Sequence, residues 1–289
     1  MKIGIIGSSD SWHCQELQKS WQKQNVQPVF IDPKCLVAIL GDGSSVQAQD
    51  INLEDMDLLM VRNIPGGSLE QVIFRMDALH QLENGGLRII NTPAAIEKMV
   101  DKYYTLSLLE QQGLLVPPTR VMENEVDAMQ AFEQLGGDVV LKPLFGSRGV
   151  GMVRLSDREV AGRVFHSLET GAYIYYLQKF IPHGNSDLRV LVIGGEYAAA
   201  MERVSNSWKT NISQGAGPKA VEMDDEIKKA SLIAAQAVGA DYCGVDLLRG
   251  EDAKLYAIEV NSMPAWQGLQ TVTPFNIADR IVTYCIRFR

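Results

Sequence analysis

Cysteine is scarce in this sequence, and its positions exclude the sites that cysteine pairs build. The chain has four cysteines, Cys14, Cys35, Cys243 and Cys285, and no two of them form a Cys-x-x-Cys pair. A disulfide-stapled domain or a cysteine-based zinc site would need such pairs at close spacing. We therefore predict reduced thiols, most of them in the core, and a cytoplasmic location.

Long hydrophobic runs and an excess of basic residues are also missing. The first residues, MKIGIIGSSDS, lack the apolar stretch of a signal peptide, and no run is long enough to span a bilayer. Acidic residues outnumber basic ones, 35 to 27, which gives a formal net charge of −8. Proteins that bind nucleic acids or membrane surfaces favour a basic face, so we expect neither partner.

Several familiar catalytic patterns are absent as well. The four histidines, His13, His80, His166 and His183, have no metal-ligand spacing and no evident serine or cysteine partner, which argues against a zinc site or catalytic triad. No Gly-Lys-Ser/Thr sequence marks a P-loop. The N-terminal glycines lack the three-glycine spacing of a dinucleotide-binding turn, so NAD binding and a dehydrogenase are disfavoured.

What is present is a large α/β chain. With 289 residues, 46% of them hydrophobic, it has room for two or three lobes. Residues 1–97 alternate strands and helices, which predicts a Rossmann-like parallel sheet covered by helices. We expect the strands at 3–7, 29–32, 57–63 and 88–91, and the helices at 14–24 and 68–83.

Two further units follow. Residues 98–183 begin with a helix capped by Asp101 and contain strong strands at 139–143 and 173–180. Residues 184–289 begin with two strands that turn at Gly194 and Gly195. A helix at 224–238, a hairpin and a last helix from Pro274 complete the expected order.

The hairpin carries the most informative pattern of the chain. Residues 244–248 (GVDLL) and 257–261 (AIEVN) are apolar strands separated by a charged break. Because side chains alternate along a strand, Glu259 and Asn261 share one face, and Asp246 on the partner strand can reach it. Two carboxylates and an amide are hard oxygen ligands that suit Mg²⁺ together with substrate phosphates. The pattern therefore predicts a metal–nucleotide site.

A glycine-rich loop at residues 146–151 follows the strand that carries Lys142. Glycines allow backbone N–H groups to approach phosphate oxygens, and a lysine beside them adds a point charge. The alternative is an ordinary glycine turn with an edge-strand lysine. Arg203, near the end of its strand, either stabilises phosphoryl charge or pairs with a neighbouring acid.

Taken together, these features resemble the ATP-grasp superfamily, and within it the RimK-like amino-acid ligases. The resemblance extends over essentially the whole chain and rests on the joint order of short motifs. They are 101–102 (DK), 140–143 (VLKP), 146–151 (GSRGVG), 178–181 (QKFI), 187–189 (DLR), 202–203 (ER), 209–211 (KTN), 244–246 (GVD) and 259–261 (EVN).

The resemblance implies an N-terminal lobe (1–97), a central lid (98–183) and a C-terminal lobe (184–289), with ATP between the last two. It implies Mg²⁺, or Mn²⁺ in its place, on Asp246, Glu259 and Asn261, and a phosphoryl-stabilising Arg203. Lys179 stands where many relatives carry Glu, so only its backbone role is carried over. The implied nucleotide-binding set is Lys102, Lys142, Gly146, Ser147, Gly149, Lys179, Phe180, Asp187, Lys209, Thr210 and Asn211.

The family chemistry is ADP-forming ligation, in which a carboxylate becomes an acylphosphate and an amine then displaces phosphate. Residues 61–71 with 75–76, and residues 259–269, look most like the tetrahydromethanopterin:glutamate ligases, which implies L-glutamate and a pterin acceptor. Arg62 and Arg75 are then candidates to meet anionic groups of the acceptor, and Trp266 to meet its ring. The alternative is that both arginines are surface charges.

Other interpretations stay open at this point. One alternative keeps the ligase but changes the acceptor to a protein C-terminus, a carrier protein or a deazaflavin coenzyme. Another is that the chain is a nucleotide-binding regulator without turnover. The sequence does not give the number of residues added, nor whether the chain forms a homo-oligomer.

Overall fold

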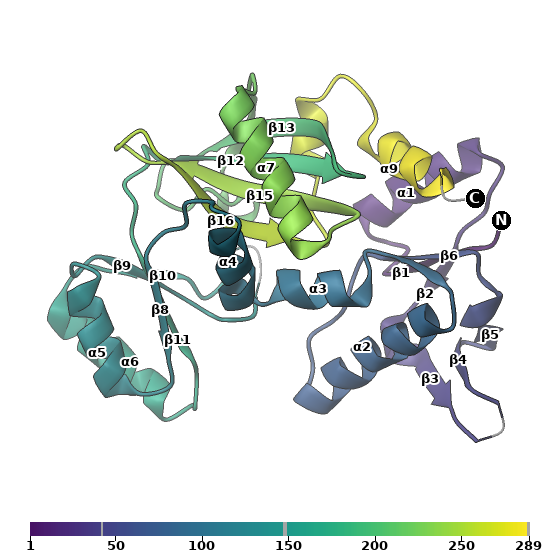
Figure 1. Cartoon of the computed structure of the whole chain (residues 1–289), viewed down its shortest axis with the longest axis horizontal. Helices are drawn as coiled ribbons and strands as arrows, with labels where there is room; N and C mark the ends of the chain where they lie inside the picture. Colours follow the sequence, from purple (N-terminus) through teal and green to yellow (C-terminus); the bar gives the residue numbers. More distant parts are fainter. Residues whose placement is uncertain (42, 147–148, 288–289) are drawn as a thin grey trace.

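A computed structural model of the chain describes residues 1–41, 43–146 and 149–287, and Figure 1 shows how their elements are arranged. The strands gather into three larger sheets, one after another along the chain, and a small sheet beside the first. The predicted α/β class is confirmed. Within the described residues, no helix is long and apolar enough to cross a membrane.

The first sheet is parallel, as the alternation of strands and helices predicts. Its elements are β1 (Ile3–Ile6), α1 (Trp12–Lys23), β2 (Val29–Ile31), β6 (Leu58–Val61), α2 (Leu69–Asn84) and β7 (Arg88–Ile90). The strands run in the order β2-β1-β6-β7, and every neighbouring pair is parallel. Leu17 and Trp21 of α1 pack on one face of the sheet, and Met76 and Leu79 of α2 on the other.

A small antiparallel sheet follows β2 and was not predicted. It consists of β3 (Leu36–Ile39), β4 (Ser45–Ala48) and β5 (Ile51–Asn52). The turn between β4 and β5 uses Gln49 and Asp50, both with positive φ. Neither residue is the glycine or asparagine that usually marks such a turn, so the sequence gives little sign of this hairpin.

Two helices lead from the first sheet toward the rest of the chain, α3 (Pro93–Val100) and α4 (Lys102–Gln111). Asp101 caps α4 by accepting a hydrogen bond from the backbone N–H of Tyr104, as predicted. Leu106 and Leu109 of α4 pack in the core under the third sheet. The helix that begins the predicted lid therefore lies against the C-terminal unit.

The second sheet is antiparallel and carries two helices on one face (Figure 1). Its order is β10-β9-β11-β8. Phe132, Phe165 and Tyr175 fill the core between sheet and helices. The elements are β8 (Thr119–Met122), α5 (Glu125–Gln134), β9 (Val139–Lys142), β10 (Val153–Leu155), α6 (Arg158–Glu169) and β11 (Tyr175–Lys179).

The third sheet is antiparallel, with the order β14-β13-β12-β15-β16. The predicted glycine turn joins β12 to β13, and the predicted hairpin joins β15 to β16. The elements are β12 (Ser186–Ile193), β13 (Glu196–Val204), β14 (Gly217–Ala220), α7 (Asp225–Val238), β15 (Tyr242–Arg249), β16 (Leu255–Asn261), α8 (Gln267–Thr271) and α9 (Ile277–Ile286).

The first and third units share a core. Ile3 and Trp21 belong to the same hydrophobic cluster as Trp266 and Ile281, and α9 lies beside α1 in Figure 1. Asn91, which is 0% exposed, adds four hydrogen bonds across this joint. Its amide nitrogen donates to the carbonyls of Tyr242 and Ser262, and its oxygen accepts from the N–H groups of Asp241 and Tyr242.

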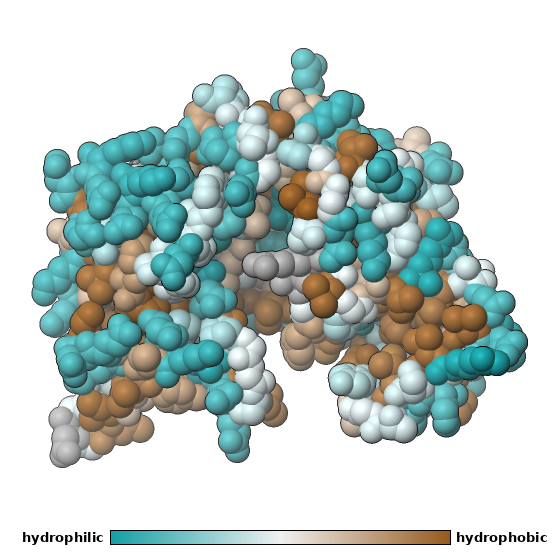
Figure 2. Space-filling model, turned by 180° about the vertical axis from the view of Figure 1, so that it is seen from behind, coloured by the Kyte–Doolittle hydropathy of each residue, from teal (hydrophilic) through white to brown (hydrophobic). Residues whose placement is uncertain are grey.

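Viewed from behind, the molecule is hollowed below its centre (Figure 2). The hollow separates two lower lobes, which correspond to the first unit and to the second sheet with its helices in Figure 1. The third sheet lies above and between them, so a ligand on its surface would be reached from this side.

Candidate active site

The third sheet has an apolar face and a polar face, because side chains alternate along each strand. The apolar face packs against α4 and α7 and consists of Leu188, Val190, Val245 and Val260. In the pairing register, Asp246 stands opposite both Arg189 and Glu259, Asp187 opposite Arg203, and Gly244 opposite Asn261. The polar face therefore collects Asp187, Arg189, Arg203, Asp246, Glu259 and Asn261 from four adjacent strands.

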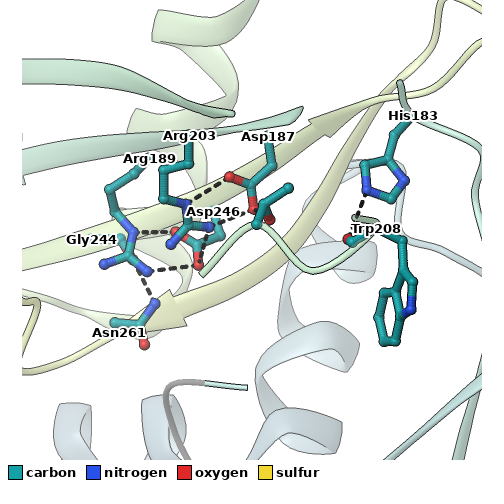
Figure 3. Close-up of polar contacts among 9 residues, drawn as sticks. His183, Asp187, Arg189, Arg203, Trp208, Gly244, Asp246 and Asn261 are labelled. Atoms are coloured by element: carbon teal, nitrogen blue, oxygen red, sulfur yellow. Dashed lines mark hydrogen bonds and ion pairs between the residues drawn. The ribbon is translucent and has the colours of Figure 1, made fainter. Parts of the chain in front are cut away.

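Asp246 is the centre of an ion-pair network (Figure 3). Arg189 donates to both carboxylate oxygens of Asp246, the second bond being 2.8 Å long, and Arg203 reaches the same carboxylate at 3.1 Å. Burial alone would raise the pKa of Asp246, but Arg189 and Arg203 outweigh burial and hold that pKa below its ordinary value. Asp246 is thus fixed as a carboxylate.

Arg203 links Asp246 to Asp187. Its guanidinium donates two hydrogen bonds of 2.6 and 2.5 Å to Asp187, and Thr210 donates a third, of 2.6 Å, to the same carboxylate. Burial opposes the charge of Arg203, but Asp246 and Asp187 together raise the pKa of Arg203. Burial raises the pKa of Asp187 despite this arginine. The ribose role of Asp187 and the phosphoryl role of Arg203 stay predictions.

Glu259 lies between the acid cluster and two lysines. Burial and the Asp246 carboxylate raise the pKa of Glu259, while Lys102 and Lys142 oppose that shift. Burial lowers the pKa of Lys142 to about 8, against the opposing pull of Glu259. Burial likewise lowers the pKa of Lys102, again opposed by Glu259. The structure thus brings both predicted phosphate lysines into the electrostatic range of the predicted metal ligands.

The three predicted metal ligands fit a hard divalent cation. They offer two carboxylates and the amide of Asn261, whose nitrogen donates to the Gly244 carbonyl at 3.4 Å. In the described part of the chain, no three His, Cys, Asp or Glu side chains gather as a metal cluster, and the predicted set has two carboxylates with the amide as its third member. Burial and, after it, repulsion from Asp246 raise the pKa of Glu259, and a cation beside the two carboxylates would offset that repulsion.

The glycine-rich loop lies next to these groups. Lys102 donates to the carbonyls of Leu144 at 3.3 Å and Gly146 at 2.7 Å, at the start of the loop. Gly149 has φ +70°, and a Cβ placed on it would lie 2.3 Å from the amide oxygen of Asn211. The loop therefore approaches Asn211 more closely than any residue with a side chain would allow. Ser147, also predicted here, lies outside the described residues.

The predicted adenine hinge lies at the end of β11. The N–H groups of Lys179 and Phe180 donate to the carbonyls of Pro118 and Asp138, at 2.8 and 2.9 Å. The side chain of Lys179 is exposed, while Phe180 is buried under Arg154, 3.5 Å from its ring centre. Both backbone donors are used within the protein, and the adenine contact stays a prediction.

The segment that follows β13 carries Lys209 beside Trp208, with the ammonium 5.4 Å from the indole ring. His183 contacts the carbonyl oxygen of Ile181 at 2.7 Å. It also contacts the carbonyl oxygen of Trp208 at 3.1 Å (Figure 3). This histidine therefore joins the hinge to the segment that bears Lys209, Thr210 and Asn211.

Arg62 and Arg75 both bind groups within the protein and neither is exposed, so the surface-charge alternative does not hold, while their contact with the acceptor stays a prediction. Arg62 donates to the hydroxyl of Tyr242 at 2.8 Å and the carbonyl of Pro264 at 3.0 Å, and lies 4.6 Å from the centre of the Trp266 ring. Arg75 is buried and donates to the carbonyl of Pro65. Trp266 is only 1% exposed, so its ring offers no open face to a ligand.

A family model described as the RimK-like ATP-grasp domain matches residues 99–285. The chain belongs to this family. The tetrahydromethanopterin:alpha-L-glutamate ligase of Methanococcus maripaludis is 33% identical, with 100% of this chain and 99% of that protein covered. The ligase of the same name from Methanosarcina acetivorans is 29% identical, with 98% of each chain covered.

A solved structure, the ATP-grasp ligase PsnB complexed with minimal precursor, shares the fold. The TM-score is 0.79, the sequence identity is 20%, and the match covers 100% of this chain and 99% of that one. As a RimK-like ATP-grasp protein, this chain is an ATP-dependent, ADP-forming ligase. This class excludes the dehydrogenase interpretation and argues against a regulator without turnover.

Arg189 and Gln178 belong to motifs noted in the sequence, but neither was predicted to have a role in the site. Arg189 stands two positions after Asp187, so strand alternation places both on one face. Gln178 is buried, accepts a 2.6 Å hydrogen bond from Lys142 and donates to Thr119 at 3.0 Å. Strand pairing across β9 and β11, which the sequence alone does not specify, brings this glutamine to the lysine.

Proposed function

We propose that this ligase joins L-glutamate to a carboxylate of a tetrahydromethanopterin-type coenzyme through an acylphosphate. The observation that supports this most directly is the polar face of the third sheet, where two lysines face two carboxylates and an amide beside a glycine-rich loop. Phosphoryl transfer needs this kind of charge neutralisation and alignment more than it needs a protein nucleophile. The full-length similarity to the methanogen ligases supports the pterin acceptor.

Each residue has a defined part in this proposal. Lys102 and Lys142 bind the phosphates, and the 146–151 loop covers them and excludes water. Asp246, Glu259 and Asn261 would hold Mg²⁺, which neutralises phosphate charge when bound. Arg203 stabilises the transferring phosphoryl group, and Lys209, Thr210 and Asn211 line the side from which the acceptor and the amine enter.

The reaction proceeds in two displacements. An acceptor carboxylate oxygen attacks the γ-phosphorus of ATP, and the bond to the β-phosphate oxygen breaks to release ADP. The amine nitrogen of glutamate then attacks the acyl carbon, phosphate leaves, and the nitrogen loses a proton as the amide forms. A site closed to water protects the acylphosphate from hydrolysis between the two steps.

The acceptor is tested by incubating the protein with ATP, Mg²⁺, L-glutamate and one acceptor at a time. The panel contains a tetrahydromethanopterin-type pterin, a deazaflavin coenzyme, a carrier protein and a peptide with a free C-terminus. Of the four acceptors, we expect only the pterin to give ADP release and a product heavier by one glutamyl residue. Glutamate incorporated into another acceptor but not into the pterin would overturn the pterin assignment. Parallel assays with Mn²⁺ show whether that ion replaces Mg²⁺.

Two further predictions, a cytoplasmic location and assembly as a homo-oligomer, need separate measurements. Light scattering of the purified chain measures its mass in solution, and fractionation of producing cells measures where it resides.

A further inference from the structure

Arg189 holds Asp246 in a way that no other described side chain on the polar face does. It is 9% exposed and directs its Nε and one terminal nitrogen to the two oxygens of Asp246, one bond to each. Arg203, in contrast, uses two bonds for Asp187 and reaches Asp246 through a single contact of 3.1 Å. Arg189 is thus the side chain that fixes the plane of the Asp246 carboxylate.

The neighbouring strand leaves space for this arginine. A Cβ placed on Gly244 would lie 3.1 Å from Cδ of Arg189 and 2.9 Å from Cβ of Pro264. The aliphatic part of the Arg189 side chain therefore passes over β15 at Gly244, which has no side chain to block it. Gly244 is also the pairing partner of Asn261, so the arginine passes close to two of the three predicted metal ligands (Figure 3).

The two carboxylates of the site explain why Asp246 needs the ion pair with Arg189. Asp246 and Glu259 are directly opposite each other on β15 and β16, and after burial the Asp246 carboxylate is the largest cause that raises the pKa of Glu259. Without Arg189, only the single 3.1 Å contact with Arg203 would hold the Asp246 carboxylate beside Glu259. A bidentate guanidinium holds the carboxylate in place and offsets part of its charge.

We propose that Arg189 is a positioning residue that orients Asp246 for the metal–nucleotide complex. The inference rests on the proposed function, because it takes Asp246, Glu259 and Asn261 as the metal ligands. Arg189 acts through Asp246 and does not itself touch the nucleotide. Partners that orient metal ligands contribute about ten- to a hundredfold to metal affinity or activity.

The test measures ADP binding by calorimetry twice, once with Mg²⁺ and once with EDTA. We expect Arg189→Met to weaken Mg²⁺–ADP binding by about ten- to a hundredfold while leaving ADP binding in EDTA unchanged. Arg189→Lys keeps the charge but loses the two parallel bonds, so it should recover part of the loss. Arg158→Met, which removes an exposed arginine paired with Glu133, is the control and should match the parent protein.

A double-variant cycle shows whether Arg189 acts through Asp246. In the Asp246→Asn background, Arg189→Met should cause little further loss of Mg²⁺–ADP affinity, because the carboxylate to be oriented is gone. Losses that add in full, or an Arg189→Met protein with the parent Mg²⁺–ADP affinity, would overturn the inference. If Arg189→Met does not fold, the same comparison with Arg189→Lys carries the test.

Glu259→Gln separates this inference from the proposed function. If Glu259→Gln weakens Mg²⁺–ADP binding and Arg189→Met does not, the metal site stands and the role of Arg189 fails. If neither change weakens Mg²⁺–ADP binding, the metal site itself is misassigned. Electron paramagnetic resonance of bound Mn²⁺ in the same variants provides a readout independent of turnover.

Discussion

Lys142 carries its ammonium group at the end of an otherwise buried strand, where burial lowers its pKa from 10.5 to about 8. Below pH 8 the lysine is charged and can hold a phosphate, and above pH 8 it progressively loses that charge. The folded state releases this proton more easily than the unfolded chain. Burial of the charged lysine therefore costs stability below pH 8, and this cost disappears as the pH rises from 8 toward 10.5.

We therefore expect kcat/KM for ATP to fall as the pH rises through about 8, since this ratio reports the free enzyme. Lys142→Arg keeps its charge throughout this range, so its profile should lack the descending limb even if its maximum is lower. The measurement is the pH profile of both proteins between pH 6 and 10. An unchanged limb in the arginine variant would assign the titration to another group.

Glu259 allows a second test at the level of one side chain. Glu259→Gln keeps the size and removes the charge, so it weakens one metal ligand and leaves strand pairing intact. We expect turnover to fall by about a hundredfold or more, comparable to the loss of a group that acts on transition-state charge. ADP release measures turnover, and circular dichroism checks the fold. ADP release at the parent rate would exclude Glu259 from the metal site.

At the scale of residues, prediction succeeded where chemistry and strand alternation agreed. Asp246 and Glu259 stand opposite each other because a hairpin with a short connection leaves few alternative registers. Arg62 was harder, because its partners Tyr242 and Pro264 are about two hundred positions away and no local pattern shows them. Trp266 was a candidate to meet the ring of the acceptor, yet the joint between the first and third units buries it.

Among the elements, the glycine-rich loop gives the clearest prediction. Gly149→Ala would place a methyl group against Asn211 and would force a non-glycine residue to φ +70°. We expect KM for ATP to rise by about tenfold or more, because the loop must shift away from the site, and a shift of about 1 Å can cost about a hundredfold in rate. Steady-state kinetics with varied ATP measure this.

Gly136→Ala is a matched control for that change. Gly136 also has a positive φ, +94°, but a Cβ on it meets nothing within 4 Å. Its substitution adds about 1–2 kcal/mol of backbone strain without a steric conflict. Its KM for ATP should equal the parent value, and equal KM increases in both variants would attribute the effect to strain alone.

Element prediction worked best for long, strongly patterned segments. The parallel sheet, the capped α4 and the β15–β16 hairpin follow from alternation, a capping aspartate and a charged break. The β3-β4-β5 sheet was missed because its strands are only two to four residues long and few of their residues are buried. The packing of α4 against the third sheet depends on contacts between distant segments, so the boundary predicted at residue 97 stays a prediction.

For the whole molecule, Asn91 connects the first and third units. Asn91→Ala would leave two carbonyls and two N–H groups of the third unit without these partners. Each unsatisfied buried group costs about 1–3 kcal/mol, so we expect a loss of about 3 kcal/mol or more in the free energy of unfolding. Urea denaturation measures this loss. Asn63→Ala, which changes an exposed asparagine on the same lobe, is the control and should have the urea midpoint of the parent protein. If Asn91→Ala also had the parent midpoint, Asn91 would not stabilise the contact between the two units.

The joint also limits how chains of this kind can be recombined. If residues 1–97 were exchanged for those of a relative, the new α1 would face an unrelated α9. The residues that replace Asn91 and Arg62 would then have to bind this chain's backbone at 241–242 and 262–264. A working chimera would therefore have to take the C-terminal helix and these short segments along with the N-terminal lobe. The second sheet, whose core is filled by its own Phe132, Phe165 and Tyr175, is the better unit to transplant.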